Sequence, residues 1–375
     1  MNHKDRIGLY IHIPFCVRKC DYCDFLSFPA HADVQLSYMD ALCKQIDATD
    51  DDRSVASVYI GGGTPSVVAP EQIERILCKL NKRFCIEKDA EITIEVNPGT
   101  VTGAHFDCYK RAGINRLSIG LQSAWDDELK LLGRIHDYQT FLQTFHAARE
   151  HGFDNINIDL MTALPDQTAE KLQHSLSAIT ALFPEHISAY SLILEEDTPF
   201  YERYAKERAG LPDEETERKL YYLTRDFLQE NGYKHYEISN FARPGYESRH
   251  NSACWRRQDY LGFGLGASSL NHGMRYHNSR DMETYLADPC KMEEMLVLSE
   301  KDCMEEFMFL GLRMLDGISV SDFSKTFSEP FDEVFGDAAK RLIDSGLLER
   351  EKDRLKLTDQ GIDHGNYVFS CFLFP

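Results

Sequence analysis

The stretch GLYIHIPFCVRKCDYCDF, residues 8–25, joins a strand-like run to a group of cysteines. Its first part, Gly8–Ile13, is apolar in the manner of a buried strand. Cysteines follow directly in the spacing C-x3-C-x2-C. A loop of this length can place three thiolates on three corners of an iron–sulfur cubane and leave one iron without a protein ligand. The sequence therefore predicts a [4Fe–4S] cluster bound by Cys16, Cys20 and Cys23.

Two other interpretations of these cysteines stay open. A structural zinc site needs a fourth cysteine or histidine, and the nearest candidates, His12 and Cys43, lie outside the usual spacing. The three thiols could also be unrelated buried side chains. A zinc-stabilised interaction protein is thus the alternative from a different functional class, and a measurement of iron content separates it from a cluster protein.

Strand-like and helix-like segments alternate after this motif. The strand-like runs are Gly8–Ile13, Ser57–Gly61, Glu91–Val96, Arg116–Leu121, Asn155–Leu160 and His186–Leu192. Helix-like segments lie between them, at residues 33–49, 70–84, 106–112, 138–151 and 168–183. The alternation predicts an α/β fold with a parallel sheet. Six βα units suit a partial (βα)6 barrel whose site lies at the C-terminal ends of the strands.

The repetition stops after about residue 200, which predicts three regions. Residues 1–205 are expected to form the partial barrel, and residues 206–298 a connecting or lid region with one charged helix over 212–231. Residues 299–375 should form a small winged-helix-like α+β domain, with a helix over 304–315, a short turn, a helix over 331–345 and two short strands. Asp332, Glu333 and Asp337 on the second helix argue against reading DNA.

Composition narrows the possible partners and the compartment. A net charge of −20, from 61 acidic and 41 basic residues, disfavours nucleic acid and anionic membrane surfaces. Apolar stretches fall short of the ~20 residues that cross a bilayer, and the N-terminus MNHKDRIGLY lacks a signal-peptide core. Eleven cysteines without a secretion signal indicate reduced thiols or metal ligands. We expect a cytoplasmic protein that is not embedded in a membrane and binds no nucleic acid.

The cysteine motif, with the aromatic Tyr22 before its last cysteine, resembles the signature of the radical S-adenosylmethionine (SAM) proteins. Similarity to their coproporphyrinogen-oxidase-like group extends over nearly the whole chain. The resemblance implies that the open iron chelates the amino and carboxylate groups of SAM. It also implies that SAM is bound by residues at the ends of successive strands, namely Tyr10, Gly62, Gly63, Thr64, Glu95, Gln122, Arg134 and Asp159.

Each of these residues has a structural alternative. An isolated glycine triplet is most often a tight turn. Glu95 or Asp159 at a strand end could instead cap the next helix or join an ion pair, and Tyr10 could simply pack in the core. Their recurrence at four strand ends favours a ligand-lined barrel mouth.

A second motif, SRHNSACWRRQDYLGFGLGASS at residues 248–269, resembles the His-Asn-x-x-Tyr-Trp motif of the HemW haem chaperones. His250, Asn251 and Trp255 match, and Cys254 stands where tyrosine is expected. Imidazole and thiolate both bind haem iron, so His250 and Cys254 are candidate axial ligands. The alternative is that the segment merely packs between the barrel and the C-terminal domain.

Two differences separate the chain from the oxygen-independent coproporphyrinogen III oxidases. Their motif continues with a cysteine two residues after the third, where this sequence has Phe25, and they carry a long segment before the motif, whereas 15 residues precede Cys16 here. The resemblance therefore implies a chaperone that binds a [4Fe–4S] cluster, SAM and haem and delivers haem to haem-requiring acceptor proteins. The oxidase is the alternative. The sequence does not decide whether SAM is cleaved, and no catalytic residue is assigned.

Overall fold

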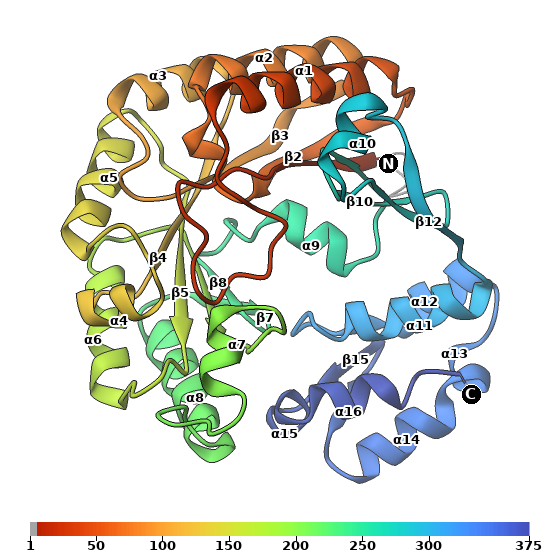
Figure 1. Ribbon diagram of the computed structural model, residues 1–375. Helices are drawn as coiled ribbons and strands as arrows, with labels where there is room; N and C mark the ends of the chain where they lie inside the picture. The colour runs from red at the N-terminus through yellow and green to blue at the C-terminus, as the bar shows by residue number, and fades with distance from the viewer. Residues whose placement is uncertain (1–5, 375) are drawn as a thin grey trace.

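Six parallel strands in chain order form the centre of one sheet in the computed structural model, which describes residues 6–374 (Figure 1). They are β1 (Arg6–Ile13), β2 (Ser54–Gly62), β3 (Cys85–Val96), β4 (Arg116–Gln122), β5 (Ile156–Thr162) and β6 (His186–Ser191). The predicted partial barrel of six βα units is confirmed. The first five residues of the N-terminal stretch and the last residue of the expected C-terminal domain lie outside the described residues.

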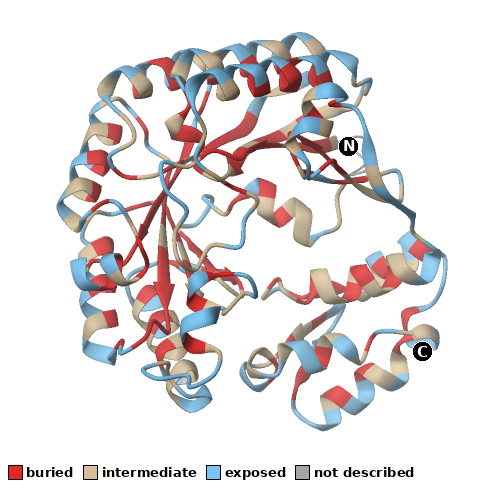
Figure 2. Cartoon of the chain, viewed as in Figure 1, coloured by how far each residue is buried: buried red, intermediate tan, exposed pale blue. Residues whose placement is uncertain are grey.

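Helices follow the strands and cover the outer face of the sheet (Figure 1). They are α1 (Ala32–Ala48), α2 (Pro70–Arg83), α3 (Gly103–Ala112), α4 (Asp126–Leu131), α5 (Tyr138–Glu150) and α6 (Ala169–Thr180). The short α7 (Pro199–Tyr204) lies instead beside the cysteine loop, where the Phe200 nitrogen donates to the Asp21 carbonyl at 3.0 Å. On α2 the buried residues Ile73, Ile76, Leu77 and Leu80 recur every three or four positions, so one stripe of the helix faces the sheet. Figure 2 shows such buried stripes on the inner sides of the outer helices.

The sheet continues beyond both ends of this central set. At one edge β9 (Tyr260–Phe263) pairs in parallel with β1 and is followed by antiparallel strands β10 (Ser268–Asn271), β11 (Met274–Asn278) and β12 (Met292–Val297). At the other edge β8 (Asn240–Ala242) and β7 (Lys234–Glu237) add antiparallel pairs after β6. Residues 206–298, expected to connect or cover the domains, therefore supply strands to the barrel sheet itself.

Three helices belong to the same region. The predicted charged helix is present as α8 (Glu214–Glu230), and α10 (Met282–Ala287) precedes β12. The short helix α9 (Arg249–Trp255) carries the haem-motif residues and lies inside the curve of the sheet, against β2 (Figure 1). The position of α9 places this motif within the barrel.

The C-terminal domain combines helices with a three-stranded sheet and has its own apolar core. Its elements are α11 (Glu300–Gly311), β13 (Ile318–Ser319), α12 (Val320–Phe327), α13 (Phe331–Val334), α14 (Gly336–Asp344), β14 (Leu348–Glu351), β15 (Arg354–Leu357), α15 (Asp359–Asp363) and α16 (Gly365–Ser370). The expected turn before residue 331 is wrong in part, because Ser319 accepts a hydrogen bond from the Asp322 backbone and begins α12 there. The expected single helix over 331–345 is also wrong. Phe335, with φ −120°, leaves helical geometry while its buried ring packs on Phe323 and Phe372.

Among residues 6–374 no helix is both long and apolar enough to cross a bilayer.

Candidate functional site

The cysteine loop follows β1 and is held by its first residues. The ring of Phe15 is fully buried and makes edge contacts with Tyr38 and Phe28, at centroid distances of 5.2 and 6.0 Å. The backbone closes the loop, since the Cys16 nitrogen donates to the Phe28 carbonyl at 3.1 Å. The three motif thiols that follow are half-buried and unpaired, at Cys16, Cys20 and Cys23. The contacts of Phe15 and Cys16 thus fix the start of the loop, and its three thiols remain accessible to a ligand.

The glycine turn after β2 lies directly on this loop. The nitrogen of Gly63 donates to the Ile13 carbonyl at 2.8 Å, and the Thr64 hydroxyl lies 3.5 Å from the Cys16 sulfur. A Cβ at Gly63 would come within 2.7 Å of the Phe15 carbonyl oxygen, and Gly62 has a φ of +115° that favours glycine. Two backbone segments can therefore approach closely enough to form one wall beside Cys16.

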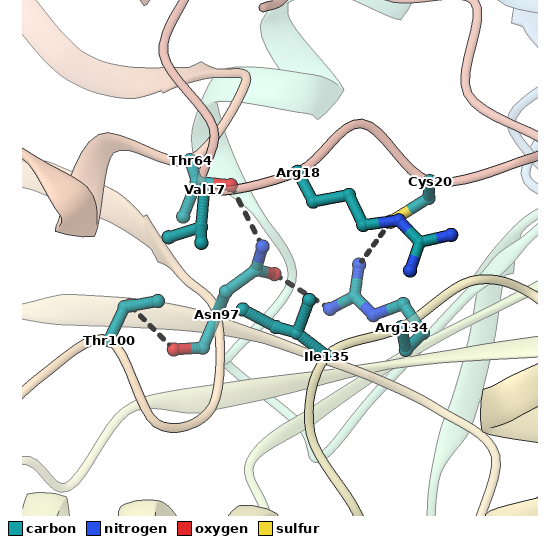
Figure 3. Close-up of a pocket in the computed structure, with 8 residues that line it drawn as sticks. All are labelled: Val17, Arg18, Cys20, Thr64, Asn97, Thr100, Arg134 and Ile135. Carbon is teal, nitrogen blue, oxygen red and sulfur yellow. Dashed lines mark hydrogen bonds between the residues drawn. The ribbon is translucent and has the colours of Figure 1, made fainter. Parts of the chain in front are cut away.

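Arg134 joins three further segments to the loop (Figure 3). One terminal nitrogen donates to Asn97 Oδ1 and to the Gly120 carbonyl, both at 2.7 Å, and the other lies 3.6 Å from the Cys20 sulfur. Asn97 in turn donates to the Thr64 hydroxyl at 2.8 Å. A small pocket opens among these side chains. The guanidinium and the Cys20 sulfur thus face the same pocket.

Glu95, at the end of β3, has both carboxylate oxygens engaged. Oε1 accepts the Tyr59 hydroxyl at 2.8 Å and Oε2 accepts the Gly62 nitrogen at 3.1 Å. Burial raises the pKa of Glu95 to about 7, the negative charge of Asp159 acts in the same direction, and the Tyr59 hydrogen bond opposes it. A carboxylate with such a pKa is sensitive to the arrival of a cation.

Asp159 on β5 faces the same interior. Its oxygens accept Asn157 Nδ2 at 2.7 Å and the Ser118 hydroxyl at 3.3 Å, and burial raises its pKa. The structure therefore brings the two acids named from sequence, on β3 and β5, into electrostatic contact across the intervening strand β4.

The remaining residues expected at the barrel mouth lie near these acids. Gln122 ends β4 with a φ of +76°, and its Oε1 accepts the Tyr190 hydroxyl at 2.9 Å. The hydroxyl of Tyr10 lies 3.0 Å from His12 Nδ1. Both side chains are part of hydrogen-bonded walls, and their contribution to binding stays a prediction.

His250 lies deep in the barrel. Its side chain is 6% exposed, with Nδ1 2.9 Å from the Ser57 hydroxyl and its ring stacked on Tyr59 at 5.3 Å. Burial lowers the pKa of His250 to about 4, which keeps the imidazole neutral. Burial likewise raises the pKa of the Cys254 thiol to about 11. His250 is thus buried and Cys254 half-buried, and ligation of a haem iron by either residue stays a prediction.

Trp255 packs toward the C-terminal domain. The guanidinium of Arg313 lies 4.3 Å from its ring centroid, and the neighbouring Arg257 donates to Glu306 at 2.7 Å. The motif segment therefore does pack between the barrel and the C-terminal domain, as one of the two interpretations expected.

Comparison with known proteins agrees with this geometry. Residues 10–179 match the radical SAM superfamily, and residues 298–364 match the HemN C-terminal domain. The heme chaperone HemW of Escherichia coli is 40% identical over 98% of each chain, and that of Lactococcus lactis is 37% identical over 97% of this chain and 96% of the relative. The chain belongs to the HemW family. The family predicted from the two motifs is confirmed.

Relatives of the HemW family include more distant proteins. A mitochondrial radical S-adenosyl methionine domain-containing protein 1 from Danio rerio is 32% identical, covering 90% of this chain and 80% of its own. Among solved structures, coproporphyrinogen III oxidase HemN from E. coli, a radical SAM enzyme, superposes with a TM-score of 0.85 at 25% identity, covering 99% and 91% of the two chains. The fold is thus common to this HemW-family chain and that oxidase.

Sequence reasoning missed three side chains that support the site, Asn97, Tyr59 and Asn157. Asn97 follows Glu95 by two residues in the same EVNP segment. Tyr59 precedes Gly61 by two and Asn157 precedes Asp159 by two, so strand alternation places each on the same face as a residue near the site. That period of two was the available signal.

Proposed function

We propose that this chain is a haem chaperone that holds a [4Fe–4S] cluster on Cys16, Cys20 and Cys23, binds SAM beside it and carries haem to haem-requiring acceptor proteins. The observation that carries the proposal is the similarity to HemW proteins over 98% of both chains, which spans the cysteine loop, the barrel and the C-terminal domain. The free state of all the cysteines among residues 6–374 supports a reducing, cytoplasmic location.

The donor set fits the cluster and SAM. Three half-buried thiols on one loop, with Arg134 next to Cys20, are suited to a cysteine-ligated iron–sulfur cluster. When bound, the cluster would offer SAM an open iron and a source of one electron. The chain's own residues then orient the cofactor: Glu95 and Asp159 provide negative charge toward the amino and ribose groups, and Gln122 offers its amide.

The second candidate function is oxygen-independent coproporphyrinogen III oxidation, favoured by the TM-score of 0.85 to HemN. The residue two positions after Cys23 argues against the oxidase function. There, in place of a further thiol, the chain carries Phe25, whose side chain is 60% exposed. The similarity to HemW proteins at 40% identity, against 25% for the oxidase, also favours the chaperone.

Anaerobic reconstitution followed by parallel assays separates the two functions. We expect reconstituted protein to contain iron and sulfide, to bind hemin with a Soret band, to transfer haem to an apo-acceptor, and to leave coproporphyrinogen unchanged. Decarboxylation of coproporphyrinogen without haem transfer would replace the chaperone by the oxidase. Zinc in place of iron would reject both.

Variants of α9 test the haem ligand. If His250 binds iron, the Soret band shifts in His250→Ala and stays in place in His174→Ala, an exposed histidine on α6. Cys254→Tyr, which restores the family pattern, changes the spectrum only if the thiol contacts iron. If both α9 variants give the hemin spectrum of the parent, the haem ligand does not lie on this helix.

A further inference from the structure

Three aromatic rings are stacked inside the barrel, below the proposed SAM site. The His250 ring lies 5.3 Å from Tyr59 with an interplanar angle of 28°, and Tyr59 lies 6.4 Å from Tyr10 at the same angle. Tyr10 and Tyr59 are register partners on β1 and β2. Tyr59 therefore stacks with a residue of the neighbouring strand and with the imidazole of α9.

The His250 ring is itself fixed from several directions. Nδ1 lies 2.9 Å from the Ser57 hydroxyl, and the backbone nitrogen donates to Glu91 Oε1 at 3.1 Å. A Cβ at Gly8 would come within 3.3 Å of the ring, so glycine at this point leaves the space that the imidazole fills. A ring held in this way can act as a rigid support for its neighbour.

The supported residue, Tyr59, reaches the site. Its hydroxyl donates to Glu95 Oε1 at 2.8 Å, and the second oxygen of Glu95 accepts the Gly62 nitrogen. This pair of bonds fixes the direction in which the carboxylate faces the barrel mouth. Without His250, the phenol would lose the packing on one face and with it the fixed position of its hydroxyl.

The start of α9 is tied to the other acid by a second route. Asn157 Nδ2 donates to Asp159, so its oxygen accepts from His186 Nδ1 at 2.6 Å. Since burial lowers the pKa of His186, the neutral ring accepts the Tyr236 hydroxyl at Nε2, 2.9 Å away. The Tyr236 oxygen then accepts the Ser248 nitrogen at 3.2 Å. Both acids thus depend on where α9 sits.

We propose that His250 is a positioning residue for the SAM site, which holds Tyr59 so that its hydroxyl orients Glu95. The inference rests on the proposed function of Glu95 in SAM binding and adds a role for α9 that is separate from haem ligation. In this proposal α9, the helix that carries the haem motif, also supports the residues of the SAM site.

The test measures SAM affinity by calorimetry on the reconstituted full-length protein. We expect Tyr59→Phe and His250→Ala each to weaken SAM binding by about tenfold, the size typical for loss of one hydrogen bond to a charged group. The double variant should bind no more weakly than the weaker single variant, because His250 acts through the Tyr59 hydroxyl. His250→Phe keeps a ring against Tyr59 and should recover most of the affinity, and His174→Ala is the matched control.

Iron content and melting temperature of each variant show whether the cluster and the fold are retained. Additive losses in the double variant would mean that His250 acts by general stability and would overturn the inference, as would parent-like SAM affinity in His250→Ala. The proposed function is tested separately by the parent protein. If the reconstituted parent binds no SAM, the SAM site itself is rejected and the inference falls with it. If the parent binds SAM and Glu95→Gln binds it equally well, the SAM site stands but Glu95 has no part in it, and the inference is overturned.

Discussion

Replacing Glu95 by glutamine removes the ionisable group on which the site's electrostatics depend. The carboxyl has a pKa of about 7 in the folded chain, against an ordinary value of 4.5. A difference of this size corresponds to about 3 kcal/mol at most. Because the side chain is half-buried and its charge is partly screened by solvent, we expect about 1–2 kcal/mol.

The sign follows from proton binding. Between pH 4.5 and about 7 the folded chain retains a proton on Glu95 that the unfolded chain has released. The free energy of unfolding therefore falls as the pH rises through this window, and the loss remains in full above it. Glutamine cannot ionise, so Glu95→Gln should gain about 1–2 kcal/mol over the parent between pH 5 and pH 8.

Urea unfolding of the cluster-free protein at a series of pH values measures this directly. Glu207→Gln, at an exposed position, is the control and should follow the parent at every pH. The reasoning is refuted if the stability difference between Glu95→Gln and the parent is independent of pH, or if it shrinks as the pH rises.

The same variant should separate stability from binding. In the parent, SAM affinity should fall below pH 7, because a protonated Glu95 loses its attraction for the amino group of SAM. Glu95→Gln should bind SAM weakly at every pH even where it is the more stable protein. Ionisation of Glu95 lowers the free energy of unfolding, and a carboxylate with this effect is typical of a residue that binds a ligand. A carboxylate that capped a helix would instead stabilise the folded chain.

Three further predictions concern the cysteine loop, the arginine beside it and the C-terminal domain. Alanine in place of any one of the three motif cysteines should abolish the visible cluster absorption after anaerobic reconstitution. Cys78→Ala, on the exposed side of α2, should retain this absorption, and an equal loss in that variant would count against the assignment. Arg134→Lys cannot reproduce the bonds to Asn97, the Gly120 carbonyl and Cys20 together, so SAM affinity should fall by about tenfold, and a parent-like affinity would contradict this. Phe323→Ala removes a fully buried ring that contacts four other phenylalanines. It should lower the unfolding free energy of the C-terminal domain by about 3–5 kcal/mol. A loss below about 1 kcal/mol in urea unfolding would show that neighbouring side chains fill the cavity.

The sequence by itself determined the features that depend on neighbouring residues. The spacing of the three cysteines, the run of apolar strands and the amphipathic helices between them are local patterns, and each corresponds to one loop, strand or helix in the structure. Because parallel strands place their C-terminal ends at one edge, Glu95 and Asp159 could also be expected at a common site.

Only the tertiary structure decided the features that join distant parts of the chain. The strands β7–β12 are three to six residues long, too short for a clear pattern, and β9 is a strand because it pairs with β1, more than 240 residues earlier. His250 meets Ser57 across 193 residues and Tyr59 beside it, so its place beneath Glu95 could not be seen from a motif that resembles a haem site. The helix expected over residues 331–345 breaks because Phe335 gains more from packing in the core than from continuing the helix. Local periodicity specifies which face of an element is apolar, but which faces meet is decided by the packing of the whole chain.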